Sequence, residues 1–157
     1  MSLGKPISLK WQRYFLGLAE YVSTASKDPS TKVGAVIVNP ETLQVISSGF
    51  NGFPQGVADT DERYNDRETK LELVAHAEAN AIARSPIPVR GLHIFITPTL
   101  MVPASCPGCS KLIVQSGIKK VWFWHEDNLS DRWEKMAKFT KIILSEGGVE
   151  WEYVPHE

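Results

Sequence analysis

Four residues in two short segments have the side chains and the spacing of a catalytic metal site. His76 and Glu78 form an H-x-E motif at the start of an apolar helical run, and Cys106 and Cys109 form a C-x-x-C motif at the start of another. One histidine and two cysteines supply three protein ligands, the usual number at a catalytic zinc site that keeps its fourth position open for water. The sequence therefore predicts a catalytic zinc ion.

The spacing inside each motif indicates which side chains would bind the metal and which would carry a proton. Cys106 and Cys109 are three residues apart, so both sulfurs can face one point, and a helix start favours their thiolate form. Glu78 would lie near the metal without binding it. The pairing of the two motifs resembles the signature of the zinc deaminases, which implies that Glu78 takes a proton from water and passes it to a ring nitrogen and a departing amine. The Ala77 backbone N–H could donate to a carbonyl of the bound base.

Other interpretations of these residues exist. A C-x-x-C pair by itself is also a redox motif, and a single histidine is more often part of a core. The two motifs together, some thirty residues apart, favour zinc. The other histidines have no partner motif, and we expect structural or solvent-exposed roles for them: His93, His125 and His156.

Apolar periodicity predicts the elements that must position these motifs. The predicted helices cover residues 11–24, 76–84, 109–116 and 132–146, and the predicted strands cover 33–38, 45–50, 92–96, 119–124 and 149–154. Helices that alternate with strands after a first hairpin predict a three-layer α/β fold with a mixed sheet. We expect one domain over 1–157 with a flexible terminus at 1–8, and a solvated loop or short helix at 57–72.

Composition narrows the class of protein. The chain has 157 residues and a formal net charge of −1, without the positive excess of a general nucleic-acid binder. Its apolar runs are far shorter than a membrane span, and its first residues show no secretory apolar region. Two cysteines are too few for a disulfide framework. We therefore expect a cytoplasmic protein that binds neither membranes nor nucleic acid.

Four motifs together resemble the cytidine and deoxycytidylate deaminase family, and most closely its deoxycytidylate (dCMP) branch. They are SKDPSTKVGAVIV at 26–38, GFNGFP at 49–54, HAEANAI at 76–82 and the segment 106–119. The resemblance spans about 11–154. It implies the cytidine-deaminase fold, a mixed five-stranded sheet flanked by helices, and the hydrolysis of dCMP to dUMP and ammonia.

The resemblance also implies roles for particular residues and partners. His76, Cys106 and Cys109 match the zinc ligands, Glu78 matches the proton shuttle, and Asn51 matches a residue that contacts the nucleotide. A nucleotide substrate and a homo-oligomer, either a hexamer or a dimer, are implied. So are dCTP and dTTP as effectors, with Mg²⁺ accompanying these nucleotides.

Two features depart from the family pattern. Thr99-Leu100 is followed by five residues before Cys106, a longer segment than usual, and Ser105 replaces the usual proline. This segment borders the base in the family, so the alternative substrate is another amino-substituted ring: deoxycytidine, a modified cytosine, a pterin or guanine. Residues 57–75 contain no cysteine or histidine for the second zinc site of some relatives, which predicts one zinc ion per chain.

No motif marks a phosphate site. Arg63, Arg67 and Lys70 are candidates because basic side chains, arginine above all, bind phosphate, although they could equally be surface charges. Two further hypotheses are a deaminase of tRNA or single-stranded DNA, which the charge balance disfavours, and an inactive zinc-stabilised binding module. The presence of Glu78 argues against the inactive module.

Overall fold

The computed structural model describes residues 5–99, 107–127 and 131–157, with the side chains of 107 and 131–136 left out. Cys106 and the 100–105 segment therefore lie outside the described residues. The elements in chain order are α1 (Leu9–Ser23), β1 (Gly34–Val38), β2 (Val45–Phe50), α2 (Asp61–Asn65), α3 (Arg67–Leu73), α4 (Ala77–Ala83), β3 (His93–Thr97), α6 (Pro107–Ser116), β4 (Lys120–Trp124), α7 (Asp131–Glu146) and β5 (Glu150–Val154).

The five strands form one mixed sheet in the order β2-β1-β3-β4-β5. β1 pairs antiparallel with β2 and with β3, so that Gly34 lies opposite Phe50 on one side and Thr97 on the other. β3, β4 and β5 run parallel to one another. The predicted hairpin and mixed five-stranded sheet are confirmed.

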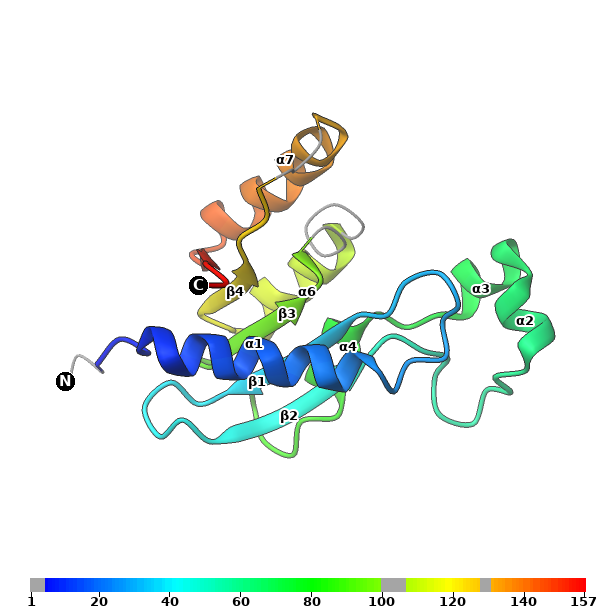
Figure 1. The fold of residues 1–157 in the computed structure, drawn as a ribbon, viewed down its shortest axis with the longest axis horizontal. Coiled ribbons are helices and arrows are strands. Elements are labelled where there is room, and N and C mark those ends of the chain that lie inside the picture. Colours follow the sequence, from blue (N-terminus) through cyan, green and yellow to red (C-terminus); the bar gives the residue numbers. More distant parts are fainter. Residues whose placement is uncertain (1–4, 100–106, 128–130) are drawn as a thin grey trace.

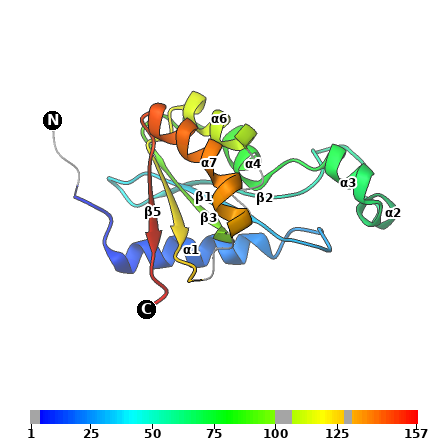
Figure 2. The same cartoon turned by 90° about the horizontal axis from the view of Figure 1, so that it is seen from above.

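Helices cover both faces of this sheet, as Figures 1 and 2 show. Successive side chains of a strand point to opposite faces. Ala35 and Ile37 of β1 accordingly belong to a core with residues of α4, α6 and α7. Val36 and Val38 belong to a second core with residues of α1. The predicted three-layer arrangement is confirmed, with α1 on one face of the sheet and α4, α6 and α7 on the other.

The polar segment 57–72 folds into two short helices that extend beyond the end of the sheet in Figure 1. The Thr60 side chain caps α2, and the Asp66 side chain caps α3 by accepting hydrogen bonds from the first backbone N–H groups. The Tyr64 ring stacks on Phe53 with a centroid separation of 4.2 Å. The expectation that all of this charged run is solvated is wrong for Lys70, which is buried.

The N-terminal region packs closer to the fold than expected. Ile7 is buried in the core beneath α1, and its carbonyl accepts a hydrogen bond from Gln12 Nε2 at 2.6 Å. The expected flexible segment at 1–8 therefore does not extend to Ile7. Among the described residues, none of the helices combines the length and the apolar character that a membrane span requires.

Candidate active site

Helix α4 carries two of the predicted site residues and lies directly against β2. Gly49 permits this contact, because a Cβ there would lie 2.4 Å from the Ala81 backbone nitrogen and 2.5 Å from the Ala77 carbonyl oxygen. The Ser47 hydroxyl also donates to the Ala81 carbonyl at 2.7 Å, and Asn80 Nδ2 donates to the Phe50 carbonyl at 2.8 Å. The helix start is therefore held firmly against the sheet.

The chain that leads into α4 is also fixed. Gly52 and Ala75 exchange two backbone hydrogen bonds, of 3.1 and 2.8 Å, in an isolated antiparallel bridge. His76 follows at once and occupies the N-cap position of α4 in an extended backbone conformation. The loop after β2 therefore fixes the position of the His76 backbone.

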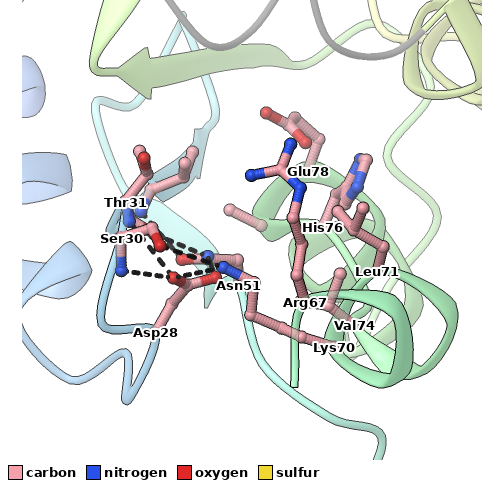
Figure 3. Close-up of a pocket in the computed structure, with 12 residues that line it drawn as sticks. Asp28, Ser30, Thr31, Asn51, Arg67, Lys70, Leu71, Val74, His76 and Glu78 are labelled. Atoms are coloured by element: carbon pink, nitrogen blue, oxygen red, sulfur yellow. Dashed lines mark hydrogen bonds and ion pairs between the residues drawn. The ribbon is translucent and has the colours of Figure 1, made fainter. Parts of the chain in front are cut away.

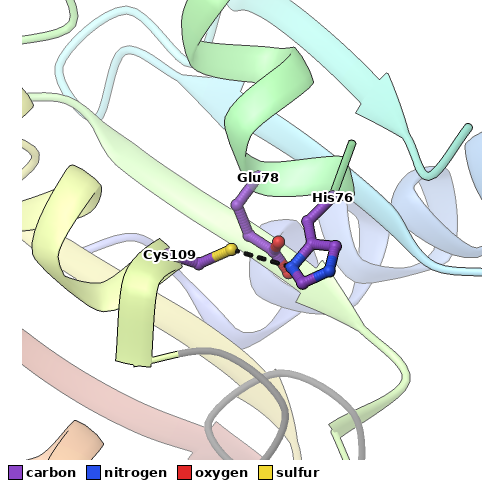
Figure 4. A group of neighbouring side chains, drawn as sticks. All are labelled: His76, Glu78 and Cys109. Carbon is purple, nitrogen blue, oxygen red and sulfur yellow. Dashed lines mark hydrogen bonds between the residues drawn. The ribbon is translucent and has the colours of Figure 1, made fainter. Parts of the chain in front are cut away.

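Two of the predicted zinc ligands and the predicted proton carrier converge where α4 meets α6 (Figure 4). His76 Nδ1 lies 3.2 Å from Cys109 Sγ, and these two atoms and a Glu78 carboxylate oxygen all lie within 4.8 Å of one another. A tetrahedral zinc ion holds a nitrogen and a sulfur ligand about 3.5 Å apart, which is close to the observed separation. The described donors therefore fit zinc, with Cys109 and Glu78 both buried.

A cavity of about 250 Å³ opens beside these residues (Figure 3). It is lined by Asp28, Ser30, Thr31, Val33, Asn51, Arg67, Lys70, Leu71, Val74, His76, Ala77 and Glu78. The structure thus brings the predicted residues Asn51, Arg67 and Lys70 together with the α4 group. Arg63 does not line this cavity, and its guanidinium donates to the Ala58 carbonyl at 3.0 Å.

A polar network that the sequence analysis did not predict forms one wall of the cavity. The Asp28 carboxylate accepts hydrogen bonds from the Ser30 and Thr31 backbone N–H groups at 2.8 and 3.1 Å. Lys70 Nζ donates to Asp28 Oδ1 at 3.1 Å and to the Ser30 hydroxyl at 3.2 Å. No local pattern in the sequence links Asp28 to a lysine 42 residues away.

The charge of Asp28 follows from these contacts. Burial favours the neutral acid, but the two backbone N–H groups and the Lys70 ammonium outweigh it and lower the pKa of the Asp28 carboxyl. Asp28 is therefore ionised at neutral pH and forms an ion pair with Lys70, and the two side chains are only 7% and 9% exposed, respectively.

Asn51 uses its side chain within the same wall. Its Oδ1 accepts from the Val33 backbone N–H at 2.8 Å, and its Nδ2 donates to the Thr31 carbonyl at 2.9 Å and to Asp28 Oδ2 at 3.4 Å. The amide that was predicted to contact a nucleotide therefore also holds the cavity wall in shape.

The other histidines lie outside this cavity. His93 Nδ1 accepts a hydrogen bond from Trp122 Nε1 at 3.0 Å, His125 pairs with Asp127, and the His156 ring stacks on Trp124. Burial, together with the nearby Lys120 and Lys119 charges, lowers the pKa of His93 to about 4. These contacts agree with the predicted structural or solvent-exposed roles.

The fold and the His-Glu-Cys group define a zinc-binding deaminase. Residues 9–125 match the family model for the cytidine and deoxycytidylate deaminase zinc-binding region, and the chain belongs to this family. The resemblance stated from the sequence motifs is thus confirmed.

Relatives of known name support the same assignment. A protein of Aliivibrio fischeri named as an uncharacterized deaminase in the luxG 3′ region is 39% identical over 93% of this chain and 95% of its own length. The human deoxycytidylate deaminase is 34% identical over 94% of this chain and 82% of its own length. The dCMP deaminase of cyanophage S-TIM5, solved in complex with dCMP and dUMP, has a TM-score of 0.69 at 27% identity, covering 94% of this chain and 98% of the phage chain.

Proposed function

We propose that this protein hydrolyses dCMP to dUMP and ammonia with one zinc ion per chain. The observation that carries the proposal is the convergence of His76, Glu78 and Cys109 at a cavity large enough to admit part of a nucleotide. The relatives named as deoxycytidylate deaminases favour a cytosine nucleotide over other amino-bearing rings.

His76 and Cys109 would hold the zinc ion, with Cys106 as the third ligand that the C-x-x-C spacing predicts. When bound there, zinc would supply the Lewis acidity that lets water ionise near neutral pH. Glu78 has the position of the proton carrier, because its carboxylate is buried within 4.8 Å of both described ligand atoms. The Ala77 backbone N–H, which also borders the cavity, would donate to the carbonyl oxygen of the base.

The proton steps assigned to Glu78 balance the reaction. Its carboxylate takes one proton from the attacking water as a C–O bond forms at the amino-bearing carbon, and gives that proton to the adjacent ring nitrogen. Glu78 then takes the proton of the new hydroxyl group and gives it to the amine as the C–N bond breaks. Ammonia leaves, the carbonyl of the uracil ring forms, and Glu78 returns to its starting ionisation state.

Ammonia release by the zinc-loaded protein tests this function, with dCMP and deoxycytidine assayed side by side. We expect turnover with a strong preference for dCMP. A preference for deoxycytidine would assign the protein to nucleoside deamination, and activity on neither would overturn both. The search would then move to modified cytosines, pterins and guanine.

The remaining expectations are part of the same proposal. We infer a homo-oligomer, either a dimer or a hexamer, located in the cytoplasm and regulated by dCTP and dTTP. Magnesium accompanying these effectors stays a prediction from the family resemblance, and we attach no residue to it. Sedimentation with and without each nucleotide tests the assembly and the regulation together.

A further inference from the structure

The helix that follows His76 begins without the usual side-chain cap. A helix start is normally fixed by an N-cap side chain that accepts a hydrogen bond from a backbone N–H of the first turn. His76 occupies the N-cap position of α4, but its side chain makes no capping hydrogen bond, and its Nδ1 lies beside Cys109 Sγ instead. Another contact must therefore fix the backbone from which the imidazole extends.

Asn80, one turn into α4, supplies such a contact. Its Nδ2 donates to the Phe50 carbonyl at 2.8 Å and also reaches the Ala75 carbonyl at 3.4 Å. Phe50 is the last residue of β2, and Ala75 directly precedes His76. A single side-chain amide therefore joins the end of a strand to the residue before a proposed zinc ligand.

Backbone hydrogen bonds complete this arrangement. The Asn80 backbone N–H donates to the His76 carbonyl at 2.9 Å, and the Ala75 carbonyl also accepts from the Gly52 N–H at 3.1 Å. The carbonyl groups of residues 75 and 76 are thus both bound by Asn80, one through its side chain and one through its backbone. A rotation of the backbone at this point would break several hydrogen bonds of a half-buried residue.

A second side-chain contact between α4 and β2 lies farther from the metal group. The Ser47 hydroxyl donates to the Ala81 carbonyl at 2.7 Å. This bond attaches the body of the helix to the sheet, but it involves neither residue 75 nor residue 76. Ser47 and Asn80 therefore differ in what they hold, since only Asn80 binds the chain at His76.

We propose that Asn80 is a positioning residue for the metal site, because its amide fixes the backbone at residues 75–76 and with it the direction of the His76 imidazole. The inference rests on the proposed role of His76 as a zinc ligand. Groups that orient a metal ligand contribute about 10- to 100-fold to metal affinity. Asn80 acts through the backbone rather than on the imidazole itself, so we expect the lower end of this range.

The zinc affinity of Asn80→Leu tests this role. Leucine has a similar branched shape and is a good helix former, but its side chain has no N–H donor. We expect the Kd for zinc, measured by competition with a chromophoric chelator, to rise about tenfold. Asn80→Gln keeps the amide on a longer stem and should recover part of the loss. A Kd for Asn80→Leu within about twofold of the wild type would overturn the proposal.

Ser47→Ala is the matched control, because it also removes one side-chain hydrogen bond between α4 and β2. We expect it to lower the Tm of the metal-free protein while its zinc affinity stays within about twofold of the wild type. Equal losses of zinc affinity in Ser47→Ala and Asn80→Leu would show that only the general attachment of the helix matters, which would contradict a specific role of Asn80.

Cobalt(II) in place of zinc gives a readout that a merely structural role would not move. The visible absorption of cobalt(II) depends on its coordination geometry, so we expect shifted bands in Asn80→Leu and wild-type bands in Ser47→Ala. Unchanged bands in Asn80→Leu would contradict the positioning role. A wild type that binds neither metal would contradict the proposed function, whereas metal binding that is insensitive to Asn80 would contradict only this inference.

Discussion

Glu78 is the residue on which the proposed chemistry depends most directly. Its side chain is only 3% exposed, and a carboxylate oxygen lies within 4.8 Å of the ligand atoms of His76 and Cys109. A carboxylate so deeply buried is costly in a stable fold unless its surroundings support it. Its burial beside zinc-type donors is what a proton carrier at a water-activating metal requires.

Glu78→Gln should keep the fold and the zinc content while losing about 10²- to 10⁴-fold in kcat, the usual contribution of a positioned acid-base group. The amide keeps the shape of the side chain but cannot carry the proton. Metal analysis and ammonia release measure the two properties separately. Glu72→Gln, an exposed change on α3, is the control. Near-normal turnover in Glu78→Gln would remove this residue from the mechanism.

His93 gives a pH-dependent prediction away from the site. Burial lowers its pKa to about 4, and the neutral ring accepts the Trp122 hydrogen bond. Between pH 6.5 and about 4 the unfolded chain binds a proton that the folded chain does not, so the free energy of unfolding falls as the pH falls. His93→Asn, which offers an acceptor oxygen, should flatten this part of a urea-denaturation pH profile. An unchanged slope would contradict the assignment to His93.

The contact between α4 and β2 positions His76, a proposed zinc ligand, and it requires that residue 49 have no side chain. In Gly49→Ala the new Cβ would meet α4 backbone at Ala77 and Ala81, which cannot move without the whole helix. We expect lower stability, by about 1–3 kcal/mol from overpacking, and weaker zinc binding because His76 shifts with the helix. Thermal unfolding and zinc titration measure the two effects.

Gly17→Ala is the matched control for this prediction. Gly17 lies inside α1, and a Cβ there would meet nothing within 4 Å. Alanine is the better helix former, so the variant should gain about 0.5–1 kcal/mol and bind zinc like the wild type. A loss of zinc affinity in both variants would mean that the Gly49 contact is not the cause.

Two parts of the chain meet at the group formed by His76, Glu78 and Cys109. Binding of a metal ion there should therefore stabilise the whole molecule. His76 precedes α4 and Cys109 lies in α6, and a bound ion would join them across 33 residues of sequence. A ligand that binds only the folded state raises the free energy of unfolding, by about 4 kcal/mol at a thousand times its Kd. Zinc should therefore raise the Tm, and a strong chelator should reverse the effect.

Cys109→Ser tests whether the stabilisation comes through this site. Its Tm should no longer respond to zinc, because the hydroxyl is a much poorer zinc ligand than a thiolate. Ser116→Ala, at the other end of α6, keeps both ligands and should respond like the wild type. A full zinc response in Cys109→Ser would place the bound ion elsewhere.

The sequence by itself determined the features that depend on short-range patterns. The strands and the longer helices follow from apolar periodicity, and a spacing of two residues in H-x-E fixes the relation between His76 and Glu78. The pairing of this motif with a C-x-x-C indicated that Cys109 would lie near them, and the structure brings the three side chains together. Each motif is visible in one sequence because its own residues are close together along the chain, whereas the meeting of the two motifs was indicated only by their occurring together.

Only the tertiary structure decided which distant residues share the cavity. Lys70 looked like one more charge in a solvated run, yet it is buried against Asp28 from a turn 42 residues earlier. Arg63 looked equivalent to Arg67, yet only Arg67 lines the cavity. The physical reason is that burial and pairing depend on which elements become neighbours in space, and the polar pattern of 57–72 is the same whichever of its cations is buried.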